Sequence, residues 1–307
     1  MHNWIKTIVL LVAVGANAHA TTILGATLSS FTVLGAETVT NVPTSVIGGN
    51  VGVWAGNAIT GFNSVANTST ADLQVTGTVE AGTPVAMTAQ SELTIAINAL
   101  NTLSGTPLPL ADLAGLVLAP GVYEVSAGVS NLTGTLTLDG MGNANAAWVF
   151  LMESSLITSP NSVVNVINTG AGAGVYWNVR SSATIDTNTT FMGNILALAS
   201  VSMLTTATDN CGRALASTGA VTLQMNSLTS ACTGILSGTE GLSGGLTYEL
   251  DAGGAPVVSF LPYAPVDGGT GGEVPEPASI CLVALGLAGL AIQRNRMRVK
   301  AVNSQVV

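Results

Sequence analysis

The chain has 307 residues, of which 48% are hydrophobic, 4% are aromatic and only 7% are charged, and its formal net charge is −9. This length accommodates one large domain or two small ones. The acidic balance opposes nucleic-acid binding, which needs basic side chains to displace counterions from phosphates.

The first twenty residues have the three parts of a secretory signal peptide. Lys6 gives a short basic region, residues 7–14 (TIVLLVAV) form an apolar core, and Ala18-His19-Ala20 has the small-x-small pattern of a cleavage site. The apolar run is too short to span a bilayer comfortably, which argues against a membrane anchor. We therefore expect export, with cleavage after Ala20.

Short apolar runs rich in Thr, Ser, Asn and Gly fill the region up to about Ile235 and predict an all-β fold. Period-two alternation predicts half-buried strands at residues 134–138 (GTLTL), 199–203 (ASVSM) and 219–223 (GAVTL). The side chains expected to face inward are Leu136, Leu138, Val201 and Met203, and those expected to face outward are Thr135, Thr137, Ser200, Ser202 and Thr222. Residues 148–152 (WVFLM) and 163–167 (VVNVI) indicate strands buried on both sides. These patterns leave a sandwich, a barrel and a solenoid open.

One segment, residues 84–103, predicts a helix. Thr83 is suited to the N-cap and Pro84 to the first turn. Leu93, Ile97 and Leu100 follow at helical spacing, and Gly105 is the expected stop. We expect this helix to lie along the β structure.

The composition between the two terminal segments excludes several kinds of catalysis. Both histidines lie in the signal peptide, and the two lysines lie in the signal peptide and in the basic C-terminal tail. Between Thr21 and Pro277 the basic residues are Arg180 and Arg213 and the acidic residues number sixteen, a formal charge of 2 − 16 = −14. Ser-His-Asp chemistry, a Schiff base and the usual zinc site are therefore absent. A carboxylate pair for glycoside hydrolysis stays formally open, although the acidic residues are scattered singly. We expect no enzyme activity, cofactor or metal.

Cysteine usage suits an oxidising compartment. Cys281 lies in the apolar C-terminal run, which leaves Cys211 and Cys232. These two predict one disulfide, with a pair of free buried thiols as the alternative.

The C-terminal end has a tripartite pattern. A glycine-rich, acidic linker is expected at residues 237–273. It precedes Val274-Pro275-Glu276-Pro277, the uncharged stretch 278–292 and a basic tail with Arg294, Arg296, Arg298 and Lys300. Such a span is expected to stop in the membrane with its basic side inward. Residues 274–300 closely resemble the PEP-CTERM sorting signal, with residues 301–307 as a short tail.

This resemblance implies an exosortase-type sorting enzyme as a partner and transient anchoring through a C-terminal transmembrane helix. It also implies a double-membraned bacterium that makes exopolysaccharide, with the mature protein released or attached outside the cell. A plain C-terminal anchor is the alternative.

Five further blocks carry a second resemblance. Residues 24–62, 116–123 (LVLAPGVY), 132–138 (LTGTLTL), 175–196 and 212–223 (GRALASTGAVTL) are similar to the microbial ice-binding protein domain. The resemblance implies a right-handed β-solenoid of triangular cross-section with one long helix packed alongside, here over residues 21–236. Because Arg213 lies in one of these blocks, we expect it to pair with a carboxylate or cap carbonyls.

Active members of that family bind ice through a flat solenoid face, and their loose motif is T-[A/G]-x-[T/N]. Thr60-Gly61-Phe62-Asn63 matches it, whereas Thr218-Gly219-Ala220-Val221 matches only the first half. Thr187, Thr189 and Thr190 alternate poorly. The candidate face consists of Thr60, Gly61, Asn63, Ser200, Ser202, Thr218 and Thr222.

We therefore expect a secreted or surface-displayed ice-binding protein of the antifreeze type. The alternative is a non-catalytic structural or adhesive protein of the exopolysaccharide matrix without ice affinity. A carbohydrate-active β-helix enzyme is a third reading. Ice binding predicts a flat face poor in charge, whereas an enzyme predicts a cleft with convergent acidic groups.

Overall fold

The computed structural model describes residues 21–42 and 44–266. The predicted signal peptide, the sorting signal and the predicted membrane span at 278–292 lie outside this part of the chain. Among the described residues, no helix is both long and apolar enough to cross a membrane.

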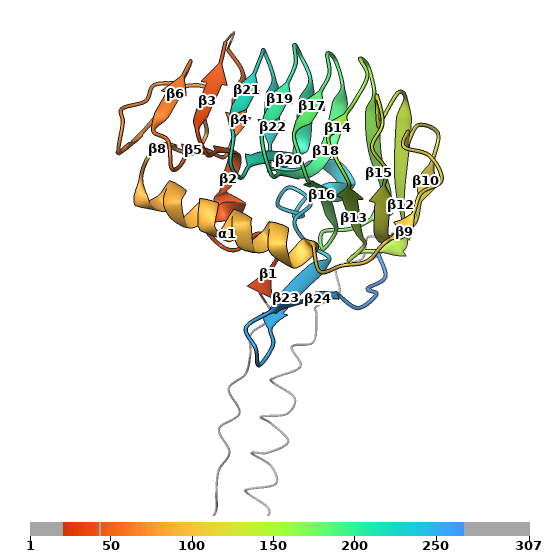
Figure 1. Ribbon diagram of the computed structural model, residues 1–307. Helices are drawn as coiled ribbons and strands as arrows, with labels where there is room; N and C mark the ends of the chain where they lie inside the picture. Colours follow the sequence, from red (N-terminus) through yellow and green to blue (C-terminus); the bar gives the residue numbers. More distant parts are fainter. Residues whose placement is uncertain (1–20, 43, 267–307) are drawn as a thin grey trace, which may run out of the picture. The chain divides into compact units, whose positions relative to one another are not determined.

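The chain winds into stacked coils whose strands form three faces, as the solenoid prediction requires (Figure 1). The six-stranded face runs in the order β14 (Leu156–Ile157), β17 (Ala183–Ile185), β19 (Val201–Met203), β21 (Val221–Leu223), β3 (Thr38–Asn41) and β6 (Ala58–Thr60). Each strand of this face pairs in parallel with its neighbours.

A 15-stranded sheet folds around the other two sides. Its helix-covered face runs through β8 (Val79–Ala81), β5 (Asn50–Val53), β2 (Phe31–Gly35), β20 (Thr208–Ala216), β18 (Thr190–Ala197), β16 (Gly174–Val179), β13 (Ala147–Met152), β11 (Gly121–Val125) and β9 (Thr106–Pro107), with β7 (Thr68–Thr70) antiparallel to β8. The third face contains β10 (Val117–Leu118), β12 (Thr135–Asn143), β15 (Val163–Thr169), the starts of β18 and β20, β22 (Ser227–Thr229) and β4 (Val46–Gly48).

The interior is packed by ladders of equivalent side chains from successive coils. Behind the six-stranded face, Ala183, Val201, Val221 and Val39 are in register and buried. An aromatic stack fills another part of the interior. The ring centroids lie 5.9 Å apart for Tyr123 and Phe150, 4.0 Å for Phe150 and Trp177, and 5.0 Å for Trp177 and Phe191. Such tight packing keeps the coils rigid.

The inward positions predicted from alternation are confirmed. Leu136, Leu138, Val201 and Met203 are fully buried, whereas Ser202 is partly exposed. Thr135 and Thr137 also reach the surface, as expected. Period-two alternation works here because one side of each strand faces the interior and the other faces solvent.

The helix α1 (Pro84–Leu100) lies along the helix-covered face and buries its outer surface (Figure 1). Outward-pointing Val149 and Tyr176 belong to one buried cluster that also contains Leu93 of the helix and Leu246. Packing within this cluster explains why β13 is buried on both sides, as predicted. The same prediction for residues 163–167 is wrong, because β15 lies on the uncovered third face and Asn165 is exposed.

The predicted start of the helix is confirmed, and its predicted end is three residues too late. The Thr83 hydroxyl oxygen accepts a hydrogen bond from the Ala86 N–H at 3.3 Å, which is an N-cap. After Leu100 the chain tightens, with Thr102 and Leu103 bonding three residues back. Gly105 instead donates its N–H to the Glu124 carboxylate at 3.0 Å, which directs the chain into β9.

The last coil closes against the first. β20, β21 and β22 pair in parallel with β2, β3 and β4, so strands about 180 residues apart in the chain are neighbours. Figure 1 shows the reason for this order: after the first coils the chain crosses through α1 to the far end, and the later coils return. The fold therefore depends on long-range pairing.

The ordered fold continues beyond the expected boundary at residue 236. Leu242 and Leu246 are buried, and β23 (Leu246–Leu250) forms a three-stranded sheet with β1 (Thr21–Thr22) and β24 (Pro256–Phe260). The linker expected at 237–273 is thus replaced by ordered structure up to Val266, where the compact unit ends, and its buried residues end at Leu246. Apolar side chains within a glycine-rich sequence are the reason for the difference.

The predicted disulfide between Cys211 and Cys232 is confirmed. It joins β20 to the segment that follows the last coil. The two residues are 21 positions apart, so the bond closes a loop that would otherwise be free in the unfolded chain.

Replacing Cys232 with serine should lower the free energy of unfolding by about 3 kcal/mol, because loop-closure entropy returns to the unfolded chain. Denaturant unfolding followed by circular dichroism, with and without reductant, measures the effect. Reductant should bring the wild type to the level of the Cys232→Ser variant and leave that variant unchanged. Equal stability of the wild type and the Cys232→Ser variant in the absence of reductant would contradict the expectation.

Candidate functional site

The six-stranded face carries a continuous row of outward side chains, one from each strand. We call this set the outer row. In strand order it consists of Thr60, Thr40, Thr222, Ser202, Thr184 and Ile157. Thr60 is exposed and the other members are partly exposed. Neighbouring strands lie about 4.8 Å apart, so the row is a regular line of hydroxyl and methyl groups.

A second row runs parallel to the outer row, two positions earlier in each strand or in the turn before it. It consists of Ala58, Thr38, Ala220, Ser200, Ser182 and Ser155, of which Ala58 and Thr38 are paired directly. The Ser200 hydroxyl oxygen accepts from the Ala220 N–H at 3.1 Å, and the Ser182 hydroxyl oxygen accepts from the Ser200 N–H at 3.3 Å. Both rows are free of charged side chains.

The structure places some of the predicted residues together on this face. Thr60, Ser202 and Thr222 belong to the outer row, and Ser200 belongs to the second row. Thr60 comes from an early coil and Thr222 from the last, yet only Thr40 stands between them.

Three other predicted residues shape the turns near the face or bond to backbone carbonyls there. Gly61 has a φ of +87°, and a Cβ there would lie 1.8 Å from the Asn41 carbonyl oxygen, so only glycine fits the turn. Asn63 lies beyond the strand and donates its side-chain N–H to the Ala71 carbonyl oxygen at 2.7 Å. The Thr218 hydroxyl donates to the Leu198 carbonyl oxygen at 2.6 Å, at the turn before β21.

Sequence reasoning missed Thr40 and Thr184. The signal was available, since residues 38–41 (TVTN) and 183–185 (ATI) alternate in the same way as the recognised segments. The threonines judged uncertain do not lie in either row: Thr189 is buried and Thr190 begins β18 on the third face. Alternation identifies an outward residue, but it does not say which face the residue occupies.

Comparison with known proteins supports the resemblance seen in the sequence. The ice-binding-like family matches residues 33–229. This chain belongs to the ice-binding-like family. The PEP-CTERM protein-sorting motif matches residues 273–296, which contain the predicted sorting residues Val274, Pro275, Glu276, Pro277, Arg294 and Arg296. These six residues lie outside the described part of the chain.

The chain is similar in sequence to known ice-binding proteins and similar in structure to solved ones. The chain is 43% identical over 218 residues to an ice-binding protein of Nostoc sp. (strain HG1), covering 71% of this chain and 77% of that protein. A crystal structure of an ice-binding protein from an Antarctic biological consortium superposes with a TM-score of 0.60 at 30% identity, covering 75% and 96% of the two chains. An Arctic yeast ice-binding protein with antifreeze activity gives a TM-score of 0.60 at 27% identity over 68% and 94%.

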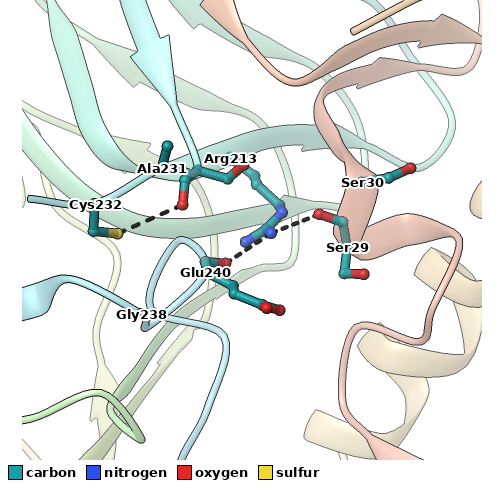
Figure 2. Close-up of a pocket in the computed structure, with 8 residues that line it drawn as sticks. Ser29, Ser30, Arg213, Ala231, Cys232, Gly238 and Glu240 are labelled. Atoms are coloured by element: carbon teal, nitrogen blue, oxygen red, sulfur yellow. Dashed lines mark hydrogen bonds between the residues drawn. The ribbon is translucent and has the colours of Figure 1, made fainter.

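A pocket between the last coil and the N-terminal segment contains Arg213, which is almost fully buried (Figure 2). Its Nη2 donates to the Ser29 carbonyl oxygen at 2.6 Å and to the Glu240 carbonyl oxygen at 2.8 Å. Its Nη1 donates to Asn194 Oδ1 at 2.8 Å. The guanidinium thus joins three separate segments, which confirms the expectation that it caps carbonyls.

The Asp209 carboxyl is buried near Arg213 without full compensation. Burial raises the pKa of Asp209 well above its usual value, against the opposing effects of N–H groups from Cys211 and Gly193 and the charge of Arg213. Its Oδ2 has no hydrogen-bond partner among the described residues. Over residues 21–42 and 44–266, no group of three or more His, Cys, Asp or Glu side chains could hold a metal ion.

Asp209 should make stability depend on pH. A carboxyl whose pKa is raised by folding binds its proton more tightly in the folded state, so stability falls as the pH rises above the unfolded pKa of about 3.9. Asp209→Asn keeps the shape and removes the charge, and it should raise stability at pH 7 by roughly 1–3 kcal/mol.

Thermal unfolding of the wild type and the Asp209→Asn variant between pH 4 and pH 8 tests this. The advantage of the variant should grow with pH and shrink toward pH 4. A constant difference across this range would show that the carboxyl does not titrate differently in the two states.

Proposed function

We propose that this chain is an exported protein that binds ice through the outer and second rows of the six-stranded face. The observation that carries the proposal is the uninterrupted outer row, in which five of the six side chains bear a hydroxyl. The names of the relatives support ice as the ligand. The register of the strands supports the six-stranded face as the surface that binds it.

The chemistry of the face suits a solid lattice of water. Threonine presents a hydroxyl group and a methyl group side by side, so it can hold water by hydrogen bonding while limiting its movement. Charged groups would hold strongly oriented hydration shells, and neither row contains one. Many weak contacts of this kind act together only when their spacing is regular.

Rigidity supports the same conclusion. The outer row is backed by the buried ladder of Val39, Val201 and Val221, which fixes the position of each strand. A surface that is already ordered loses little conformational entropy when it meets ice. The long-range pairing of the first and last coils extends this order across the whole face.

We propose that the chain has no catalytic role. The Arg213 guanidinium is engaged with backbone carbonyls and with Asn194. The buried Glu80 carboxylate accepts hydrogen bonds from the hydroxyls of Ser69, Thr78 and Thr83, which together lower its pKa despite the opposing effect of burial. The Arg213 guanidinium and the Glu80 carboxylate therefore stabilise the fold and are not free to take part in a reaction.

The proposal also includes export through the N-terminal segment and sorting through the C-terminal segment. The matched PEP-CTERM motif supports an exosortase-type partner and a final position outside the cytoplasm. The N-terminal pattern supports cleavage after Ala20, and the apolar stretch 278–292 supports transient anchoring before processing.

Thr222→Tyr tests the face at its centre. The bulky ring should prevent the neighbouring rows from meeting a flat crystal, and the protein concentration needed to inhibit ice recrystallisation should rise about tenfold, which corresponds to a loss of about 1.4 kcal/mol. Thr60→Tyr should have a smaller effect, because β6 is the edge strand of the face.

Ser91→Tyr, on the exposed surface of α1, is the matched control and should behave as the wild type. Circular dichroism establishes that each variant is folded, and thermal hysteresis gives a second readout. Full activity of Thr222→Tyr would refute the assignment of the face. An inactive but folded wild type would refute ice binding and favour a matrix role.

A further inference from the structure

The described chain continues for 37 residues after the family match ends. We call residues 230–266 the C-terminal extension. The matched family region stops at residue 229, at the end of β22. The extension therefore lies outside the coils that build the six-stranded face, and its contacts indicate a separate task.

The first part of the extension is fixed along the solenoid. The Cys211–Cys232 disulfide holds its start, and the Arg213 guanidinium binds the carbonyl oxygen of Glu240. The Val175 N–H then donates to the Leu242 carbonyl oxygen at 2.9 Å, and the Gly244 N–H donates to the Ala173 carbonyl oxygen at 3.0 Å. These contacts lead the chain from β20 across to β16.

The second part joins the two ends of the described chain. β23 and β24 form an antiparallel hairpin, and β1 pairs with β23 so that Thr21 lies opposite Tyr248. Leu246 is buried in the cluster that contains the helix, and Tyr248 and Val258 pack against this cluster. The N-terminal strand and the C-terminal hairpin are thus held together next to α1.

The exit point is also fixed. The Ala144 N–H donates to the Ala264 carbonyl oxygen at 2.6 Å, and the Val266 N–H donates to the Gly142 carbonyl oxygen at 2.9 Å. Without the extension the chain would leave at Ser230, beside Gly48 at the end of the third face. With the extension, the chain leaves beside Gly142 at the end of β12. β1, β23 and β24 lie on the side of α1, opposite the six-stranded face (Figure 1).

We propose that the C-terminal extension orients the domain, so that a protein attached through its C-terminal end presents the six-stranded face outward to ice. This inference rests on the proposed ice-binding function and adds the way in which the surface is presented. Only residues 267–272 separate the extension from the matched sorting motif. Six extended residues span at most roughly 20 Å, so the start of the sorting motif can be no farther than that from Val266.

Attachment to beads tests the orientation. Protein ending at Val266, the boundary of the compact unit, is biotinylated at its C-terminus and captured on streptavidin beads. Two matched proteins are attached instead through Ser91→Cys, on the exposed surface of α1, and through Ser202→Cys, in the outer row. Capture of the beads by a growing ice surface is measured at equal protein density.

Beads attached through the C-terminus and through residue 91 should be captured by ice, and beads attached through residue 202 should lose capture. Equal capture by all three kinds of bead, or capture only through residue 202, would overturn the proposed orientation. Recrystallisation inhibition by the free wild-type protein is measured in parallel. Its absence would refute ice binding itself, whereas its presence together with uncaptured C-terminal beads would refute only the orienting role.

Discussion

Hydrogen bonding between successive coils, in fixed parallel register, is the constraint on which the rest of this structure depends. Thr222 lies between Ser202 and Thr40 because the inner residues beside them, Val221, Val201 and Val39, are in register. A slip of one residue would move the valines to the surface and the hydroxyls into the interior. Hydrophobic packing inside the coils thus determines the regularity of the surface outside them.

The three faces differ in what covers them. Outward residues of the helix-covered face, such as Val149 and Tyr176, are apolar or aromatic and are buried in one cluster with residues of α1 and of the C-terminal extension. Outward residues of the six-stranded face are mostly threonine and serine and remain accessible. The pattern of outward side chains therefore matches the position of the helix, because each uncovered apolar group would cost free energy in water. Of the two faces that the helix leaves uncovered, the six-stranded face is the one suited to ordered water.

Polar and covalent links replace coil packing where the solenoid is irregular. The pairing of β18 with β20 shifts register between Phe191 and Gly193, next to the corner where Asp209, Arg213 and the disulfide lie. There the Arg213 guanidinium joins the N-terminal segment, a central coil and the C-terminal extension. Burial raises the pKa of the Asp209 carboxyl beside it. The corner stabilises the arrangement that keeps both ends of the described chain away from the six-stranded face.

The sequence alone determined the local features. Alternation gave the inward and outward sides of residues 134–138, 199–203 and 219–223, the capping pattern gave the start of the helix, and two cysteines outside the terminal segments gave the disulfide. These features depend on neighbours within a few residues, so a sequence pattern can express them. The family resemblance added the solenoid, which alternation by itself could not distinguish from a sandwich or a barrel.

Only the tertiary structure decided which outward residues share a surface. Thr40 and Thr60 come to lie beside Thr222 because the last coil closes on the first, across about 180 residues of sequence. Residues 163–167 are exposed on one side because α1 covers a different face, and Asn63 and Thr218 bind backbone carbonyls because the chain turns there. Leu242 and Leu246 convert an expected linker into packed structure. In each case the deciding contact joins distant parts of the chain, and local sequence patterns contain no information about such contacts.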